Sequence, residues 1–280
     1  MTQADDTLRQ WRETSTFWTR HSDIIKEMFA PLTEALIREA GISEGDSVLD
    51  VAGGAGEPSL TIAERVGPTG SVTCTDAVAE MVEAARAEGA SRGLTNVKFK
   101  QCSADALPFA DESFDVVVSR LGAMFFPDPL AACREMLRVT KRGGTIALVV
   151  WHKSELNPFC HIVSDVISRH VPAQPEDPDA PGAFRFAELG KLSSILTQAG
   201  ASEVTDKVLQ LQMRAPISAE QFWTIRSEIS ETLRTKLATL YEAEREQVAQ
   251  EVQESVRPFF PNDQMNFPTQ MVIVTGEKPA

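Results

Sequence analysis

An acidic residue and a run of glycines stand at the end of an apolar stretch in VLDVAGGAGEPSLTIA, residues 48–63. Asp50 lies in the apolar stretch, three of the four residues from Gly53 to Gly56 are glycine, and a helical pattern follows. Glycines allow a ligand to approach the backbone, and the first turn of a helix offers free N–H groups at its positive end. We therefore predict a nucleotide-type binding loop at the carboxyl end of a strand, where open α/β sheets bind their ligands.

The residues of this loop narrow the class of ligand. A dinucleotide fingerprint G-x-G-x-x-G that starts at Gly54 would need glycine where the chain has Ser59, and the sequence contains no Gly-Lys-Ser/Thr of a phosphate-binding P-loop. Asp50 would repel a pyrophosphate, whereas it would attract an ammonium or a sulfonium group. The loop thus favours a cationic ligand, with a plain tight turn as the structural alternative.

The segment resembles motif I, D-x-G-x-G-x-G, of the class I S-adenosylmethionine-dependent methyltransferases, except that Ala52 replaces the first glycine. The resemblance extends over residues 42–152 and implies S-adenosyl-L-methionine as cofactor and S-adenosyl-L-homocysteine as product. Asp76 corresponds to the acid that holds the ribose hydroxyls, Met81 to the apolar residue against the adenine, and Asp105–Ala106 to the pair that reads the adenine. The cofactor-binding residues implied in this way are Asp50, Ala52, Gly53, Gly54, Gly56, Asp76, Met81, Asp105, Ala106, Ser119 and Arg120.

The methyl acceptor should bind beyond the cofactor, near the carboxyl ends of the fourth and fifth predicted strands and near the N-terminal segment. His152 follows the fifth strand directly and could act as a general base; a solvent-exposed loop histidine is the alternative. Arg120 could pair with an acidic acceptor or with the cofactor carboxylate, or instead with Asp128 or Glu135. The predicted substrate-binding residues are Trp18, His21, Phe125 and Trp151.

Short β-branched runs alternate with helical stretches over residues 42–152, which predicts a parallel sheet with helices on both faces. We expect an α/β, Rossmann-like fold with a mostly parallel sheet of seven strands. An N-terminal helical segment, residues 1–41, should precede the S-adenosylmethionine-binding core, residues 42–152. Residues 153–280 should supply helical insertions and the last two strands.

The flanking segments are expected to form a lid over this core. Residues 5–40 have the apolar periodicity of one helix, and residues 217–257 that of one or two charged helices. The last two strands are predicted at residues 204–213 and 270–275. A proline-rich acidic loop is expected after residue 171.

Acidic residues outnumber basic ones by 40 to 27, which gives a formal net charge of −13. Binding to nucleic acid needs a basic face, so we expect no nucleic-acid partner. The longest apolar run is far shorter than the roughly 20 residues that span a bilayer, so we expect no membrane insertion. Four scattered cysteines without a CxxC pair indicate reduced thiols in a cytoplasmic protein, and no metal site is expected.

Together these patterns predict a methyltransferase that moves a methyl group from a sulfonium to an oxygen, carbon or nitrogen atom of a small molecule by in-line displacement. Such chemistry needs aligned reactants rather than a nucleophile or a metal. The whole chain is similar to ubiquinone/menaquinone C-methyltransferases and their natural-product relatives. An NAD(P)-dependent oxidoreductase and a nonenzymatic S-adenosylmethionine-binding protein are the alternatives, although the one tyrosine, Tyr241, lacks the lysine four residues on that the first would need. The acceptor and the oligomeric state stay open.

Overall fold

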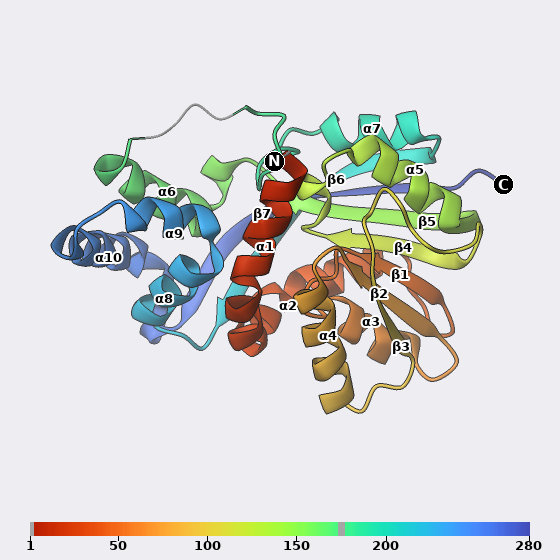
Figure 1. Cartoon of the computed structure of the whole chain (residues 1–280), viewed down its shortest axis with the longest axis horizontal. Helices are drawn as coiled ribbons and strands as arrows, with labels where there is room; N and C mark the ends of the chain where they lie inside the picture. Colours follow the sequence, from red (N-terminus) through yellow and green to blue (C-terminus); the bar gives the residue numbers. More distant parts are fainter. Residues whose placement is uncertain (1–2, 173–176) are drawn as a thin grey trace.

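One sheet of seven strands forms the centre of the molecule, in the order β3-β2-β1-β4-β5-β7-β6 (Figure 1). The computed structural model describes residues 3–172 and 177–280, and the side chains of residues 7–172 and 177–280. Residues 173–176 of the expected proline-rich loop lie outside this range. The strands are β1 (Ser47–Val51), β2 (Ser71–Asp76), β3 (Val97–Gln101), β4 (Phe114–Arg120), β5 (Thr140–Trp151), β6 (Ser202–Ala215) and β7 (Met265–Glu277).

The first five strands are parallel, and β7 runs antiparallel between β5 and β6. The central strands are buried on both faces, which explains their uninterrupted apolar runs at residues 116–118 and 146–150. The strand order reverses between β1 and β4, and ligands of open α/β sheets bind at such a switch point. The predicted Rossmann-like, mostly parallel seven-stranded fold is confirmed.

Helices cover both faces of this sheet. They are α2 (Ser22–Glu39), α3 (Ser59–Val66), α4 (Ala79–Ser91), α5 (Pro129–Val139) and α7 (Lys191–Ala199). The crossovers through α3 and α4 move across the sheet in one direction, and the crossover through α5 moves in the other. Because such crossovers are right-handed, α3 and α4 cover one face, and α5, which packs beside α7, covers the other.

The N-terminal segment consists of two helices, so the expectation of one helix over residues 5–40 was wrong. Helix α1 (Gln3–Arg20) ends before His21, whose backbone is not helical (φ −102°, ψ 15°), and α2 begins at Ser22. His21 and Arg20 both bind Glu228 of a distant helix. This tertiary pairing holds the corner, and the apolar periodicity of the segment carries no sign of it.

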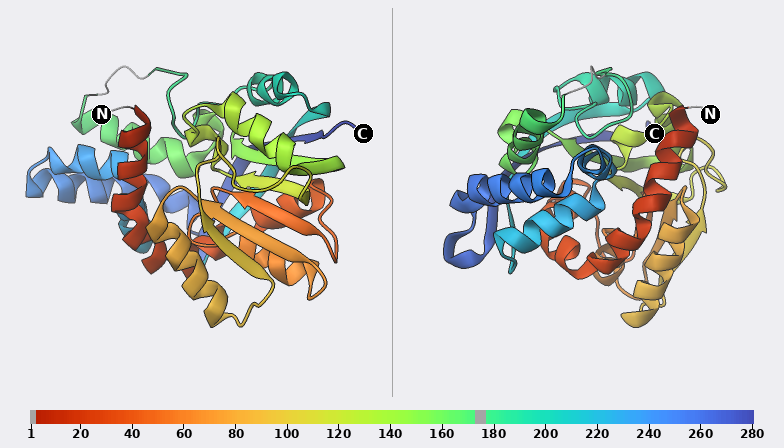
Figure 2. Two further views of the ribbon diagram at one scale, coloured as in Figure 1. Left: turned by 45° about the vertical axis from the view of Figure 1, so that its right-hand side comes forward. Right: turned by 60° about the vertical axis from the view of Figure 1, so that its left-hand side comes forward.

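A helical lobe stands beside the sheet and contains α6 (Pro158–His170), α8 (Ala219–Ile229), α9 (Glu231–Ala238) and α10 (Glu242–Val256). Residues 217–257 therefore form three helices rather than one or two, because polar caps interrupt them. Ser218 makes a capping box with Gln221, and Ser230 accepts a hydrogen bond from the N–H of Leu233. Figures 1 and 2 show α1 between this lobe and the sheet, and α1 contacts α4 on one side and α8 and α9 on the other.

The β6–β7 ribbon joins the lobe to the sheet. Trp151 at the end of β5 pairs with Met271, so the part of β7 before Met271 extends beyond β5 into the lobe. Phe267 is fully buried there and contacts Phe159 of α6 and Phe222 of α8. Both strands are thus longer than predicted, because the lobe buries their outer halves.

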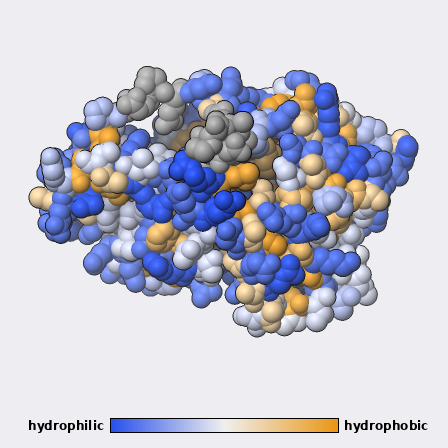
Figure 3. All heavy atoms as spheres, in the orientation of Figure 1, coloured by the Kyte–Doolittle hydropathy of each residue, from blue (hydrophilic) through white to orange (hydrophobic). Residues whose placement is uncertain are grey.

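On the face drawn in Figure 3, hydrophilic residues predominate and hydrophobic ones lie in small, separate groups. All four cysteines are free, as predicted. Within residues 3–172 and 177–280, no helix combines the length and the apolar character that a membrane span requires, and no cluster of side chains suited to a metal ion is found.

Candidate active site

The glycine loop runs from the carboxyl end of β1 to the first turn of α3, and its backbone is fastened to β2. The N–H of Gly53 donates to the carbonyl of Thr75 (2.8 Å), and the N–H of Gly54 donates to Oδ2 of Asp76 (3.0 Å). A Cβ on Gly53 would lie 2.6 Å from Oδ2 of Asp50, so no other residue fits there. A Cβ on Gly54, whose φ is +57°, would meet nothing within 4 Å. The loop therefore faces open space at Gly54.

Asp50 is fully buried beneath this loop. Its Oδ2 accepts a hydrogen bond from the hydroxyl of Ser59 (2.5 Å), whereas its Oδ1 is buried without a partner among the described residues. Burial raises the pKa of Asp50 from 3.8 to about 6, and Ser59 and Arg120 oppose this rise only in part. An anionic oxygen without a donor is a binding place for a cation or an N–H group.

Asp76 lies at the end of β2 and holds the next turn of the chain. Besides the N–H of Gly54 it accepts the N–H of Val78 (2.9 Å), through its other oxygen. Burial raises the pKa of Asp76, although these two N–H groups counteract the effect. A carboxylate has about four acceptor positions, so two oxygens with one bond each can still accept ligand hydroxyls. Met81 is buried in the first turn of α4, the helix that follows β2.

Asp105 and Ala106 lie on an exposed loop after β3. The hydroxyl of Ser103 binds the Asp105 carboxylate. The loop is anchored two residues later, where the N–H of Leu107 donates to Glu135 (2.9 Å). The anchoring leaves the Asp105–Ala106 pair accessible at the rim of the sheet.

Ser119 and Arg120 end β4, beside the glycine loop. The hydroxyl of Ser119 is buried and has no partner in the described part of the chain. It lies close to the loop, since a Cβ on Gly122 would touch both Ser119 and Ala52 at 2.7 Å. Arg120 donates to the hydroxyl of Thr33 (2.6 Å) and to the carbonyl of Glu57 (2.9 Å). It binds neither Asp128, which caps α5, nor Glu135, which pairs with Arg138, so the pairing considered as an alternative is wrong. No sequence signal identified Thr33 as its partner.

Trp151 and His152 follow each other at the end of β5. His152 is only 8% exposed, which excludes the alternative of a solvent-exposed histidine. Its Nδ1 lies 2.7 Å from the carbonyl oxygen of Ala187. Because a carbonyl only accepts, Nδ1 carries the hydrogen, and in the neutral ring Nε2 is then the free base. Trp151 stacks on Phe159 of α6 and meets the ring of Phe29 edge-on.

The substrate-side residues predicted on or near α1 separate into two groups. Trp11 contacts both Trp18 and Phe125, with ring centroids 5.8 and 5.1 Å away, so α1 closes over the end of β4 through a tryptophan that sequence reasoning missed. His21 directly follows the last turn of α1, three residues after Trp18, and its Nε2 lies 2.6 Å from Glu228. Trp18 and Phe125 are thus joined through Trp11, whereas His21 is paired with Glu228.

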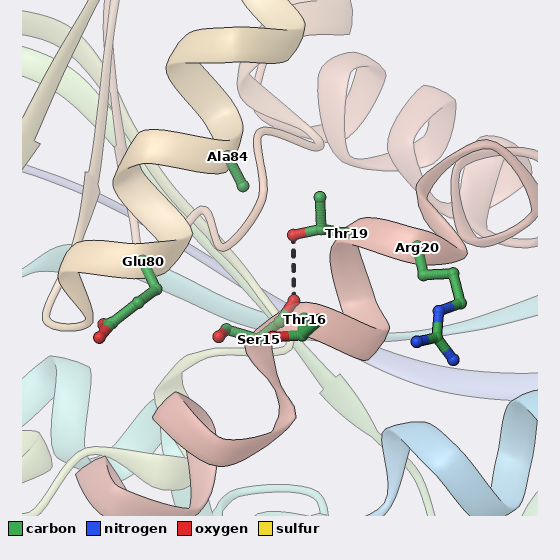
Figure 4. Close-up of a pocket in the computed structure, with 6 residues that line it drawn as sticks. All are labelled: Ser15, Thr16, Thr19, Arg20, Glu80 and Ala84. Carbon is green, nitrogen blue, oxygen red and sulfur yellow. Dashed lines mark hydrogen bonds between the residues drawn. The ribbon is translucent and has the colours of Figure 1, made fainter.

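Two open hollows, each of about 450 Å³, lie beside α1 and its corner with α2. The first, drawn in Figure 4, lies between α1 and α4, and Thr19 donates there to the carbonyl of Ser15. The second lies between the start of α2 and α8, with His21 in its wall. Glu80 of the first hollow stands four residues after Asp76, which places this hollow next to the predicted adenosine side of the loop.

Comparisons with known proteins agree with this geometry. Residues 42–176 match the family described as a methyltransferase domain. The uncharacterized protein Rv1405c of Mycobacterium tuberculosis is 44% identical over 126 residues, 45% of this chain and 44% of that protein. The ubiquinone/menaquinone biosynthesis C-methyltransferase UbiE of Xanthomonas oryzae pv. oryzae is 43% identical over 109 residues, 39% of this chain and 43% of that enzyme.

Residues 42–176 of this chain are thus similar to methyltransferase domains. The matches span less than half the length of these curated relatives. Solved structures agree with the fold of most or all of this chain. YcgJ of Bacillus subtilis has a TM-score of 0.55 at 22% identity and covers 89% of this chain, with 98% of YcgJ matched. Phosphoethanolamine N-methyltransferase 2 of Haemonchus contortus, in complex with S-adenosyl-L-methionine, has a TM-score of 0.60 at 16% identity, over 100% of this chain and 60% of that one.

Proposed function

We propose that this protein uses S-adenosylmethionine to methylate a small molecule. The observation that carries the proposal is the glycine loop between Asp50 and Asp76, in which the N–H of Gly54 binds the Asp76 carboxylate while the space beyond Gly54 is open. The match of residues 42–176 to the methyltransferase family supports it. The dinucleotide alternative is disfavoured because Ser59, in place of the third glycine, donates to the buried Asp50.

The residues at the loop fit the chemistry of the cofactor. The unpartnered Oδ1 of Asp50 would accept from the ammonium group, and the unpartnered hydroxyl of Ser119 would donate to the carboxylate of the same amino-acid part. Asp76 would hold the ribose hydroxyls, and Met81 and the Asp105–Ala106 loop would hold the adenine. Arg120 supports the loop from below through the carbonyl of Glu57 and acts as a positioning residue.

When bound, the cofactor supplies an electrophilic methyl group on a sulfonium. The chain's own part is to orient the acceptor and to exclude water, and alignment of this kind contributes about 7–11 kcal/mol to such reactions. We propose that His152 accepts a proton from the acceptor at Nε2, because Ala187 holds its Nδ1–H. Trp18, Phe125 and Trp151 would surround the acceptor, whereas the contact of His21 with Glu228 assigns His21 to the anchoring of α1.

The acceptor class is proposed from charge and from coverage of the site. The net charge of −13 opposes binding of nucleic acid, and Trp11, Trp18 and Phe125 bring α1 over the end of β4. A covered site suits a small acceptor better than a folded macromolecule. The four free cysteines support a reducing, cytoplasmic location.

The proposed function is tested by turnover. The purified protein and S-adenosylmethionine are incubated with a metabolite extract of low molecular mass and, separately, with RNA and with protein, and S-adenosylhomocysteine is quantified. We expect formation of S-adenosylhomocysteine with the small-molecule extract, and a slower rate for the variant His152→Gln with unchanged cofactor affinity. Formation with RNA or protein alone would contradict the small-molecule acceptor, and full activity of His152→Gln would remove His152 from the mechanism.

A further inference from the structure

Arg226 of α8 has no acidic partner among the residues that the structure describes, although the protein is strongly acidic. Two other partly buried arginines pair with carboxylates: Arg92 with Glu57, and Arg138 with Glu135. Among the described residues, none forms an ion pair or a hydrogen bond with Arg226, and its Nε is buried without a partner. Desolvation of an unpaired cation is unfavourable, and burial accordingly lowers the pKa of this guanidinium.

The side chain of Arg226 points into the molecule rather than away from it. It shares a helix face with the buried Phe222 and Ile229, which stand four residues before it and three after it. The nearest acid along the chain, Glu228, is already engaged by Arg20 and His21 of the α1–α2 corner. Unlike Nε, the two terminal nitrogens are not sealed from solvent, and they make no hydrogen bond to described residues. The forked end of the guanidinium is therefore free.

A ladder of rings connects this guanidinium to the methyl-donor end of the site. The Cζ of Arg226 lies 4.6 Å from the ring centroid of Phe159, which stacks on Trp151 at 5.9 Å. Trp151 in turn contacts Phe29 at 6.3 Å, and Phe29 lies under Arg120 at 5.4 Å. Since Arg120 holds the glycine loop, the free guanidinium and the loop mark the two ends of one ladder of buried aromatic rings.

A second arginine of the lobe has similar surroundings. The guanidinium of Arg234 in α9 lies 5.1 Å from the ring centroid of Phe17 in α1, and its Nε is also buried, with no partner in the described ranges. Ion pairs with Arg234 are likewise missing among the described residues. Two unpaired cations, each against an aromatic ring, therefore come from the lobe helices that pack on α1.

We propose that Arg226 binds an oxyanion of the methyl acceptor, so that the substrates are hydrophobic, ring-containing carboxylates or phosphate esters. A planar guanidinium with both terminal nitrogens free matches such a group in bidentate geometry, and the ring beneath fixes its plane. The anion would supply the negative charge that no described residue places beside Arg226. The ring ladder would separate it from the methylated atom. This inference rests on the proposed function, because it assigns the anion to the acceptor.

The test uses matched ligands on the protein saturated with S-adenosylhomocysteine: 2-naphthoate, its neutral analogue 2-naphthamide, and 2-naphthyl phosphate, each titrated by calorimetry. We expect wild type to bind at least one anion about 10-fold or more tightly than the amide, as charged hydrogen bonds imply. Arg226→Gln should remove this preference without changing the affinity for the amide, and Arg226→Lys should keep part of it. The control Arg245→Gln, which removes an exposed arginine of α10, should keep all of it. The tighter of the two anions identifies a carboxylate or a phosphate ester.

Two results overturn the inference. One is that the wild-type protein binds neither anion more tightly than it binds the amide, which includes the case that it binds none of the three ligands. The other is an anion preference that survives in Arg226→Gln. Titration of S-adenosylhomocysteine into the same preparations separates this failure from that of the proposed function. Normal cofactor binding without an Arg226-dependent preference overturns only the oxyanion site. Loss of cofactor binding in wild type overturns the proposed function and with it the assignment of the anion to an acceptor.

Discussion

The variant Asp50→Asn should make the cofactor-free protein more stable at neutral and alkaline pH. Asparagine retains an oxygen that accepts the hydroxyl of Ser59, but it carries no charge to desolvate. The folded-state pKa of Asp50, raised from 3.8 to about 6 by burial, means that the folded protein holds this proton more tightly than the unfolded chain. Wild type therefore loses stability as the pH rises from about 4 to about 6, and the loss is complete above that range.

The size of the effect follows from the two pKa values. Their difference corresponds to about 3 kcal/mol for a fully buried group, which is the upper limit of the gain from Asp50→Asn at pH 8. The gain should shrink toward zero near pH 4, where both side chains are neutral. Urea unfolding of wild type and variant between pH 4 and pH 8, each without cofactor, measures it.

The variant Asp115→Asn is a matched control, and its effect on stability should have the opposite sign. Asp115 is partly buried, but the hydrogen bond from Lys141 keeps the pKa of its carboxyl below the ordinary value. Asp115→Asn should therefore lower stability at pH 8 and have less effect at pH 3. A difference between Asp50→Asn and wild type that stays constant or falls with rising pH would refute the account of a desolvated carboxylate.

Three further variants test the loop. Gly54→Val should fold yet lose cofactor binding, because a branched side chain is strained at φ +57° and would fill the open space that the cofactor needs; a normal titration would contradict this role of the loop. Asp76→Ala should weaken cofactor affinity by about 1–3 kcal/mol through lost charged hydrogen bonds, and unchanged affinity in calorimetry would refute its role. Ala52→Gly should stabilise the protein by up to about 1 kcal/mol, since Ala52 has φ +60°; an unchanged or lower melting temperature would exclude strain there.

The part of the fold around the glycine loop was predictable because each of its strands and turns has a recognisable pattern in its own residues. The runs that became β1, β4 and β5 are apolar on consecutive positions because both faces of these strands are buried. The glycine loop was recognisable because its glycines are required locally. Gly53 leaves space beside Asp50, and Gly54 has a positive φ.

Contacts between distant segments were not predictable in this way. The corner at His21 depends on Glu228, more than 200 residues later, and the burial of His152 depends on the carbonyl of Ala187. Trp11 was missed because a tryptophan on an amphipathic helix has the same pattern whether it packs in a core or covers a site. The partners of Arg120 on α2 and in the glycine loop left no trace in the spacing of charges.

The most direct test of the account is a calorimetric titration of wild type with S-adenosylmethionine and, separately, with NADH. The account predicts saturable binding of one S-adenosylmethionine per chain, an affinity that rises with pH through about 6 as Asp50 ionises, and no binding of NADH. Binding of NADH, with none of S-adenosylmethionine at any pH, would contradict it.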